Sequence, residues 1–200
     1  MGRHCGWLTG ATVEAYRKRL DDWEFLPGMR LARECWDVHA VWVPEMDIDL
    51  EGEVDRLNKV MDDHDCVNLF LSEGAGMDAI IREKEAAGEE VRRDAFGHAR
   101  LDELNPGKWF ATKLKERLGA DKVLVQKSGY FGRSAAPNER DLELIRKSAF
   151  AAAEYALNGE SGVAGLDEDE GGVMSCIGFP RIKGGKPLDI DLAWFGEMLG

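Results

Sequence analysis

The stretch that decides the fold is Cys66-Val67-Asn68-Leu69-Phe70-Leu71 together with the turn after it, Ser72-Glu73-Gly74-Ala75-Gly76. The first six residues form a short apolar run typical of a buried strand, and the glycines that follow favour a turn. Helical spacing then predicts a helix to about Ala87, with Gly88 as its C-cap. A strand, a glycine turn and a helix in this order are typical of a sheet with parallel strands.

Two more runs, Val38 to Val43 and Lys122 to Gln126, also predict strands, and segments with helical spacing separate all three. Between the first two strands, apolar residues that include Val54 and Leu57 share one face of a predicted crossover helix. This alternation predicts the α/β class, with a mostly parallel sheet flanked by helices and a right-handed β-α-β unit.

Further along, Asn105-Pro106-Gly107 predicts a helix start, and Asn138 is expected to cap a long helix that ends near Asn158-Gly159. The residues of the long helix that we expect to face inward are Leu142, Ile145, Ala149 and either Ala152 or Ala153. Residues 161–200 are rich in glycine and show one predicted strand, Val173 to Phe179. We therefore predict an α/β domain over residues 1–160 and a carboxyl-terminal extended segment over residues 161–200 that packs on it.

The composition limits the partners. The 200 residues carry 38 acidic and 26 basic side chains, a formal net charge of −12, which disfavours nonspecific attraction to nucleic acid or to an anionic membrane. No run approaches the about 20 apolar residues of a membrane span, and the first residues lack a signal-peptide pattern. These features predict a cytoplasmic protein that uses neither nucleic acid nor membrane, and any anionic ligand must be held by local basic side chains.

Four widely separated cysteines form no CxxC pair, which favours reduced thiols over disulfides. Cys35 and His39, with His64 and Cys66, could formally supply four zinc ligands. Cys66 is the first residue of a predicted apolar strand, however, and burial in that strand explains the direction of its side chain better than a metal does. We therefore predict no metal site in this sequence.

Glu73 is the first candidate for binding, because ligands of open α/β sheets lie where a strand gives way to such a turn. A carboxylate there can accept hydrogen bonds from sugar hydroxyls. From spacing alone, an equally good interpretation is that Glu73 neutralises the start of the following helix.

Basic side chains form the other candidates. Lys127, Tyr130 and Arg133 place three donors within seven residues after a predicted strand, which suits one phosphate group, and a solvated loop with an arginine ion pair is the alternative. Arg3, after Met1 and Gly2, is from sequence alone best explained as a surface arginine near a chain end.

Two motifs resemble those of a known family. Met1-Gly2-Arg3-His4-Cys5-Gly6-Trp7 and Gly129-Tyr130-Phe131-Gly132-Arg133-Ser134-Ala135 are similar to the sugar-phosphate motifs of the phosphofructokinases, and the second has the form of the diphosphate-dependent branch. In that family the Met-Gly-Arg motif lies near the middle of the protein. The resemblance therefore implies that the chain is a phosphofructokinase-like carboxyl-terminal half. The amino-terminal part of the fold would be missing, and the predicted domain over residues 1–160 would be incomplete at its start.

The resemblance also implies the chemistry. It implies transfer of a phosphoryl group from diphosphate to the 1-hydroxyl of fructose 6-phosphate, with this chain on the sugar side. Ser72-Glu73-Gly74 matches the glutamate that binds fructose hydroxyls. Tyr130 and Arg133, with Lys127, match the 6-phosphate site, to which a neighbouring subunit often contributes a basic residue. Met1 and Arg3 would line the sugar pocket with Gly2, with Arg3 as the catalytic residue near the transferring group.

The family takes its base and its magnesium ligands from Gly-Gly-Asp and Thr-Ile-Asp-Asn-Asp motifs, and neither motif occurs here. The resemblance thus implies Mg²⁺ as cofactor with its ligands in the missing half, and a homo-oligomer or a partner that supplies that half. The chain alone is expected to be inactive. The alternative is a noncatalytic module, truncated or dependent on a partner, that binds sugar phosphate or serves assembly.

Three other motifs have less specific interpretations. Lys108, at a predicted helix start, can attract an anion, although most such lysines are solvated. The acidic run Asp167 to Glu170 fails the EF-hand pattern and is expected to be a solvated turn. The basic run Pro180 to Lys186 lacks the P-loop pattern and is expected to be a surface loop.

Overall fold

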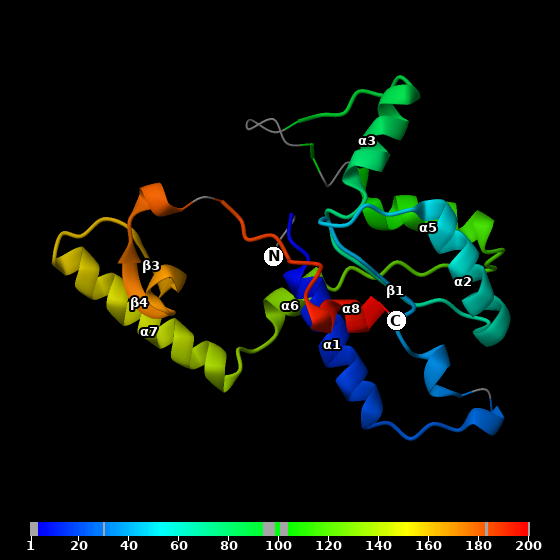
Figure 1. The fold of residues 1–200 in the computed structure, drawn as a ribbon, viewed down its shortest axis with the longest axis horizontal. Helices are drawn as coiled ribbons and strands as arrows, with labels where there is room; N and C mark the ends of the chain where they lie inside the picture. Colours follow the sequence, from blue (N-terminus) through cyan, green and yellow to red (C-terminus); the bar gives the residue numbers. More distant parts are fainter. Residues whose placement is uncertain (1–3, 30, 94–98, 101–103, 183, 200) are drawn as a thin grey trace. The chain divides into compact units, whose positions relative to one another are not determined.

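The computed structural model describes residues 4–29, 31–93, 99–100, 104–182 and 184–199 (Figure 1). Its elements are α1 (Trp7–Asp21), η1 (Pro27–Met29), η2 (Arg33–Cys35), β1 (Ala40–Trp42), α2 (Leu50–His64), β2 (Leu69–Leu71), α3 (Met77–Ala86), α5 (Pro106–Arg117), α6 (Gly129–Ser134), α7 (Glu139–Leu157), β3 (Val163–Asp167), η3 (Glu168–Glu170), β4 (Val173–Ile177), η4 (Phe179–Arg181) and α8 (Ala193–Leu199). They form two compact units, residues 1–126 with 186–200 and residues 127–185. The predicted boundary at residue 160 falls inside the second unit.

The first unit is built on a small parallel sheet. Strands β1 and β2 pair in parallel, with Ala40 opposite Leu69 and Trp42 opposite Leu71, and α2 connects them. This arrangement is the predicted β-α-β unit and confirms the mixed α/β class. The parallel sheet is small, because β1 and β2 are its only strands among the described residues.

Both faces of this sheet are covered, which explains why β1 is apolar throughout. Val41 and Val43 pack with Val13 of α1 and Phe195 of α8, and all four side chains are buried. On the opposite face Ala40 and Trp42 pack with Val54 and Leu57 of α2 and Phe110 of α5. A strand buried on both faces needs apolar residues at consecutive positions rather than at alternating ones.

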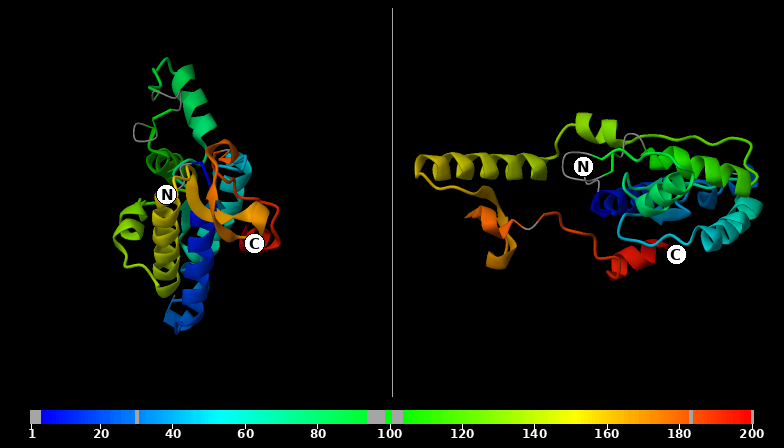
Figure 2. Two further views of the ribbon diagram at one scale, coloured as in Figure 1. Left: turned by 90° about the vertical axis from the view of Figure 1, so that its left-hand side faces the viewer. Right: turned by 90° about the horizontal axis from the view of Figure 1, so that it is seen from above.

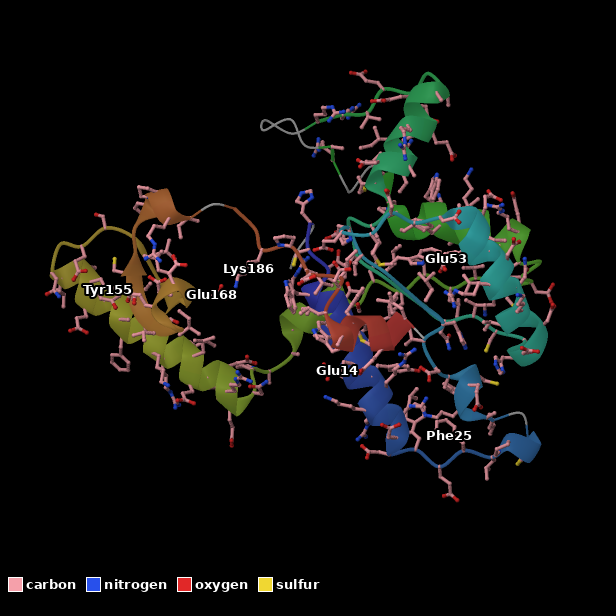
Figure 3. All side chains as sticks on the ribbon, viewed as in Figure 1. Glu14, Phe25, Glu53, Tyr155, Glu168 and Lys186 are labelled. Atoms are coloured by element: carbon pink, nitrogen blue, oxygen red, sulfur yellow. The ribbon has the colours of Figure 1, made fainter. Side chains whose placement is uncertain are left out.

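Trp42 shows how the second face accommodates a polar group. Its ring centroid lies 4.9 Å from that of Phe110, and its Nε1 donates to Glu53 Oε2 at 3.0 Å. Glu53, labelled on α2 in Figure 3, also accepts from Arg56, and this contact lowers the pKa of its carboxyl. The indole N–H is therefore satisfied inside an apolar cluster, as buried tryptophans require.

The helices expected on either side of residue 100 are confirmed. Helix α3 ends at Ala86, and Gly88 follows it with a φ of 75°. Helix α5 begins at Pro106, and the Asn105 side chain accepts the backbone N–H of Lys108. None of the helices among the described residues is long and apolar enough to cross a membrane.

The third predicted strand is wrong. Residues 122–126 have no strand assignment, and Leu124 is 80% exposed. The apolar run Val123-Leu124-Val125 has strand composition, but within the described part of the chain no strand edge pairs with it. Composition alone does not make a strand, because the backbone also needs a ladder partner.

The second unit combines the long helix with a hairpin. Helix α7 is straight in both views of Figure 2 and starts with a capping box in which Asn138 and Asp141 bond each other's backbone N–H. Strands β3 and β4 pair antiparallel, with Gly165 opposite Ser175, and both contact α7. The predicted cap and the strand at 173–177 are confirmed. The prediction that residues 161–200 are otherwise extended missed strand β3 and, at the end of the chain, helix α8, which buries Phe195 and Met198.

The predicted inward face of α7 is also wrong. Leu142, Ile145 and Ala149 are exposed, and so are Ala152 and Ala153. The side that meets the hairpin carries Ala151 and Tyr155, whose hydroxyl donates to the Met174 carbonyl oxygen at 3.1 Å. The small alanine side chain lets the hairpin approach on a side that the apolar pattern did not indicate.

The acidic turn differs in part from expectation. Glu168, Asp169 and Glu170 form the exposed η3 turn, but Asp167 is only 3% exposed. Arg181 donates to both oxygens of Asp167, at 2.5 Å and 2.7 Å. The two runs that were expected to be a solvated turn and a surface loop are thus joined by a two-bond ion pair inside one unit.

Candidate functional site

Glu73 lies on a turn whose backbone is held by hydrogen bonds. The N–H of Ser72 donates to the Trp42 carbonyl oxygen at 2.9 Å, and the Ser72 carbonyl accepts from the Ala75 N–H at 3.1 Å. Ser72 is 3% exposed, whereas Glu73 is exposed. The carboxylate of Glu73 is therefore presented to solvent at the carboxyl ends of the parallel strands, the edge where ligands of such sheets bind.

The other end of this turn requires glycine. Gly76 has a φ of 66°, and a Cβ atom on it would lie 2.5 Å from Cζ of the buried Phe110. The turn thus combines a left-handed backbone with a close approach to an aromatic ring. Among the described residues Glu73 has no hydrogen-bond or ion-pair partner, so its carboxylate is free to accept from a ligand.

The amino-terminal segment reaches the same edge of the sheet. The N–H of Gly6 donates to Glu45 Oε1 at 3.0 Å, and Glu45 follows β1 closely in sequence. A Cβ atom on Gly6 would lie 2.6 Å from the Val43 side chain, so the close packing depends on glycine here. Met1, Gly2 and Arg3 themselves lie outside the described residues.

Tyr130 and Arg133 lie together in the second unit. The Arg133 guanidinium carbon is 5.7 Å from the centroid of the Tyr130 ring, and both side chains are exposed on α6. Lys127, two residues before this helix, is exposed as well. These three donors share one unit, whereas Glu73 belongs to the first.

The local structure around Arg133 differs from the prediction. The expected arrangement was a strand end followed by a loop, but Gly129–Ser134 is a short helix, α6, in which Ser134 Oγ donates to the Tyr130 carbonyl oxygen. The Y-x-x-R spacing explains the contact, because residues three apart are neighbours on a helix. Lys108, the candidate with the least specific motif, is exposed near the start of α5.

The four residues considered as zinc ligands do gather, but the polar side-chain atoms of Cys35, His39 and Cys66 contact backbone groups. The His39 and His64 ring centroids are 6.0 Å apart, and Cys66 Sγ donates to the Cys35 carbonyl oxygen at 3.1 Å. His39 uses both ring nitrogens, since Nδ1 accepts the Asn68 N–H and Nε2 contacts the Glu34 carbonyl oxygen. Burial lowers the pKa of His39 and favours its neutral form.

The described part of the chain also lacks a cluster of metal-ligating side chains. No group of three or more His, Cys, Asp or Glu side chains there is placed to hold a metal ion. The described residues therefore do not fit a magnesium site.

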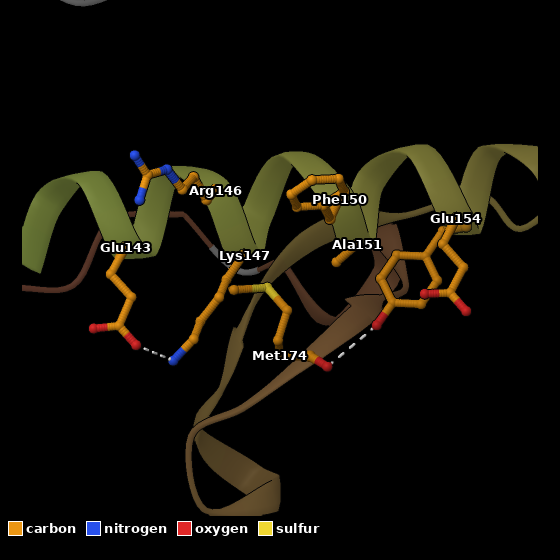
Figure 4. Close-up of a pocket in the computed structure, with 8 residues that line it drawn as sticks. Glu143, Arg146, Lys147, Phe150, Ala151, Glu154 and Met174 are labelled. Atoms are coloured by element: carbon orange, nitrogen blue, oxygen red, sulfur yellow. Dashed lines mark hydrogen bonds and ion pairs between the residues drawn. The ribbon is translucent and has the colours of Figure 1, made fainter.

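A shallow pocket on α7 holds none of the predicted site residues (Figure 4). Its lining residues are Glu143, Arg146, Lys147, Phe150, Ala151, Glu154, Tyr155 and Met174. Within it Lys147 pairs with Glu143 at 2.6 Å, a contact that lowers the pKa of that carboxyl. The pocket does not combine charges in a way that suggests a ligand.

Comparison with known proteins shows which class of enzyme the chain is similar to. The chain is similar over its full length to diphosphate-dependent phosphotransferases that act on a sugar phosphate, although no family model matches it. The relatives are named pyrophosphate–fructose 6-phosphate 1-phosphotransferase. Those from Methylomonas methanica, Propionibacterium freudenreichii subsp. shermanii and Mastigamoeba balamuthi are 59%, 51% and 51% identical over 199 residues.

These matches confirm the resemblance to the diphosphate-dependent branch of the phosphofructokinases. They cover 100% of this chain and 48–49% of each of these relatives, so the chain spans about half their length. Sequence motifs alone were sufficient to find this similarity. They did not indicate the pairing of Thr9 with Ser72 or the contacts of Glu45, which join segments far apart in sequence.

Proposed function

We propose that this chain supplies the fructose 6-phosphate side of a diphosphate-dependent phosphofructokinase, with the phosphofructokinase-like fold of a carboxyl-terminal half. In the proposed reaction the 1-hydroxyl oxygen of the sugar bonds to a phosphorus of diphosphate, and phosphate leaves. The observation that carries the proposal is the exposed carboxylate of Glu73, which has no partner among the described residues and lies on a turn that buried contacts fix.

Glu73 is assigned to the fructose hydroxyls. A carboxylate accepts from two neighbouring hydroxyls, and hydrogen bonds to a charged group contribute about 1.5–3 kcal/mol each. Because the turn is fixed before the sugar binds, little ordering remains to be done on binding.

Arg133, Tyr130 and Lys127 are assigned to the 6-phosphate. Arg133 offers a two-bond fork to phosphate oxygens, Tyr130 offers a hydroxyl donor, and Lys127 offers a mobile positive charge. With a net charge of −12 the chain repels anions at long range, so local donors of this kind are needed to bind a phosphate.

Met1, Gly2 and Arg3 are assigned to the sugar pocket next to the transferring group, with Arg3 as the catalytic residue. Support comes from the anchoring of the next described residues, since Gly6 is bonded to Glu45 near the edge that carries Glu73. An arginine that neutralises charge on a transferring phosphoryl group lowers the barrier electrostatically.

The base for the 1-hydroxyl and the ligands for Mg²⁺ are assigned to the region of the relatives that this chain does not match. The proposal therefore includes a partner for that region, or a homo-oligomer with it, and a cytoplasmic location. Substrates named for the relatives, fructose 6-phosphate and diphosphate, are proposed for the assembled enzyme.

The test has two arms. In the first, calorimetric titration of the chain with fructose 6-phosphate is expected to show binding that fructose, which lacks the phosphate, does not reproduce. Glu73→Gln should weaken this binding and Lys108→Ala should not. A chain that binds fructose 6-phosphate no better than fructose overturns the proposal.

In the second arm, formation of fructose 1,6-bisphosphate is followed in a coupled assay with diphosphate and Mg²⁺. The chain alone is expected to be inactive, because a positioned base contributes about 10²–10⁴ in rate. Coexpression with the unmatched region of the Propionibacterium relative should produce activity. Binding without activity in that coexpression would support the noncatalytic alternative instead, and clear turnover by the homogeneous chain would place the base within it.

A further inference from the structure

Two hydroxyl groups meet at the edge of the sheet that carries Glu73. Thr9 Oγ1 of α1 lies 2.6 Å from Ser72 Oγ, a short hydrogen bond between residues 63 positions apart. Ser72 immediately precedes Glu73, and Thr9 lies six residues after Arg3. The bond therefore joins the segment of the Met-Gly-Arg motif to the turn of the Glu73 motif.

Burial makes this bond hard to replace. Ser72 is 3% exposed, so water does not readily take the place of Thr9. Its backbone N–H and carbonyl are already used, by Trp42 and Ala75. A buried hydroxyl that loses its partner keeps its full desolvation cost, and the turn must shift to satisfy it.

A second contact holds the same segment at the neighbouring strand. Glu45 Oε1 accepts the Gly6 N–H at 3.0 Å, and Trp42 at the end of β1 is the register partner of Leu71 at the end of β2. Residues 6 and 9 are thus bonded to the chain just beyond the carboxyl ends of two adjacent strands. The start of α1 cannot move along this edge without breaking one of the two bonds.

From this geometry we infer that Thr9 and Ser72 are positioning residues of the sugar site, which couple the placement of the amino-terminal segment to that of Glu73. The inference rests on the proposed function. Neither hydroxyl is assigned to touch the sugar, and both act through the turn that presents the Glu73 carboxylate.

Thr9→Val is the central variant, because valine keeps the shape of threonine and removes the hydroxyl. Thr12→Val is its matched control: Thr12 lies on the same helix, and its hydroxyl donates within that helix to the Leu8 carbonyl oxygen at 2.6 Å. Thr9→Ser retains a hydroxyl and serves as the rescue.

The readouts are the Kd for fructose 6-phosphate, the melting temperature and hydrogen exchange of the Ala75 amide, which bonds to Ser72. We expect Thr9→Val to raise Kd about fivefold, the size of one lost neutral hydrogen bond, and to speed exchange at Ala75. Thr9→Ser should restore both to within about twofold. Thr12→Val should leave both unchanged even where it lowers the melting temperature.

The outcomes distinguish a failure of this inference from a failure of the proposed function. A Kd for Thr9→Val within about twofold of the unsubstituted chain, at a measurable loss of thermal stability, would make the bond purely structural and overturn the inference. Absence of binding by the unsubstituted chain would overturn the proposed function. In that case hydrogen exchange at the Ala75 amide tests whether Thr9 and the turn are coupled. A faster exchange rate in Thr9→Val supports the coupling, and an unchanged rate rejects it.

Discussion

Glu45 Oε1 accepts the backbone N–H of Leu188 at 2.7 Å, across 143 positions of sequence. The same oxygen accepts the Gly6 N–H, so one carboxylate just beyond β1 holds a segment from each end of the chain. Gly6 and Leu188 are both buried, and neither N–H has water as an easy alternative. Glu45 is therefore a structural centre of the first unit.

The first prediction is that Glu45→Ala destabilises the chain by about 2–4 kcal/mol, because two buried N–H groups lose a charged acceptor. The measurement is the free energy of unfolding in urea. Glu14→Ala is the control, since Glu14 is exposed and, within the described part of the chain, pairs only with Lys18 on its own helix. Equal losses for the two variants would contradict the role of Glu45.

The second prediction concerns the turn after Glu73. Gly76→Ala should lower the free energy of unfolding by about 2–4 kcal/mol, because the added Cβ both strains a φ of 66° and overlaps the Phe110 ring. Gly88→Ala is the matched control: its φ is 75°, but a Cβ there meets no atom within 4 Å. It should lose only about 1 kcal/mol, the cost of the backbone strain. A loss equal to that of Gly76→Ala would mean that crowding against Phe110 contributes nothing.

Much of the first unit could be predicted from sequence, because its signals are local. The run 66–71 followed by glycines indicated β2 and α3, and Asn105 marked the start of α5 through its own side chain. In the second unit Asn138 marked the start of α7 in the same way. Helix α1 was not recognised, because its inward side is not purely apolar. Arg17 on that helix donates to Asp37, to the Val38 carbonyl and to the Met198 carbonyl, so a charged residue occupies a packed position.

Part of the candidate site could also be proposed from sequence, because some of its residues have local signals. Glu73 could be selected from its place after a strand, and Arg133 from its neighbours in sequence. The pairing of Thr9 with Ser72 and the contacts of Glu45 could not be predicted, because nothing near these residues in sequence indicates their partners. Their importance comes from tertiary pairing, which a periodic pattern does not encode.

The third prediction is a pH dependence in the second unit. The Arg181 guanidinium beside Asp167 lowers the pKa of that carboxyl below its ordinary value of about 3.9. A lowered folded-state pKa means that the stabilisation is complete above the unfolded value and is lost as the pH falls through the folded value. Asp167→Asn should therefore be less stable than the unsubstituted chain at pH 6, with the difference shrinking toward pH 2.

Other carboxyls titrate in the same range, since Arg56 lowers the pKa of Glu53 and Lys113 lowers that of Glu83. The measured quantity is accordingly the difference between the two chains, in which these groups cancel. Chemical unfolding at a series of pH values gives it. A difference that stays constant from pH 6 to pH 2 would show that the charge on Asp167 does not stabilise the fold.

The last prediction tests the phosphate donors. Arg133→Ala should weaken binding of fructose 6-phosphate by about 1.5–3 kcal/mol, the contribution of a charge-assisted hydrogen bond, and so by more than Lys108→Ala. Both side chains are exposed, so their loss should leave the fold intact, and Arg133→Lys separates charge from geometry because lysine lacks the fork. Calorimetry gives the Kd of the unsubstituted chain and of the three variants, and circular dichroism checks that α6 persists. Arg133→Lys should lie between the unsubstituted chain and Arg133→Ala, because a point charge still attracts phosphate but cannot donate two parallel bonds. Indistinguishable Kd values for Arg133→Ala and Lys108→Ala would remove Arg133 from the 6-phosphate site.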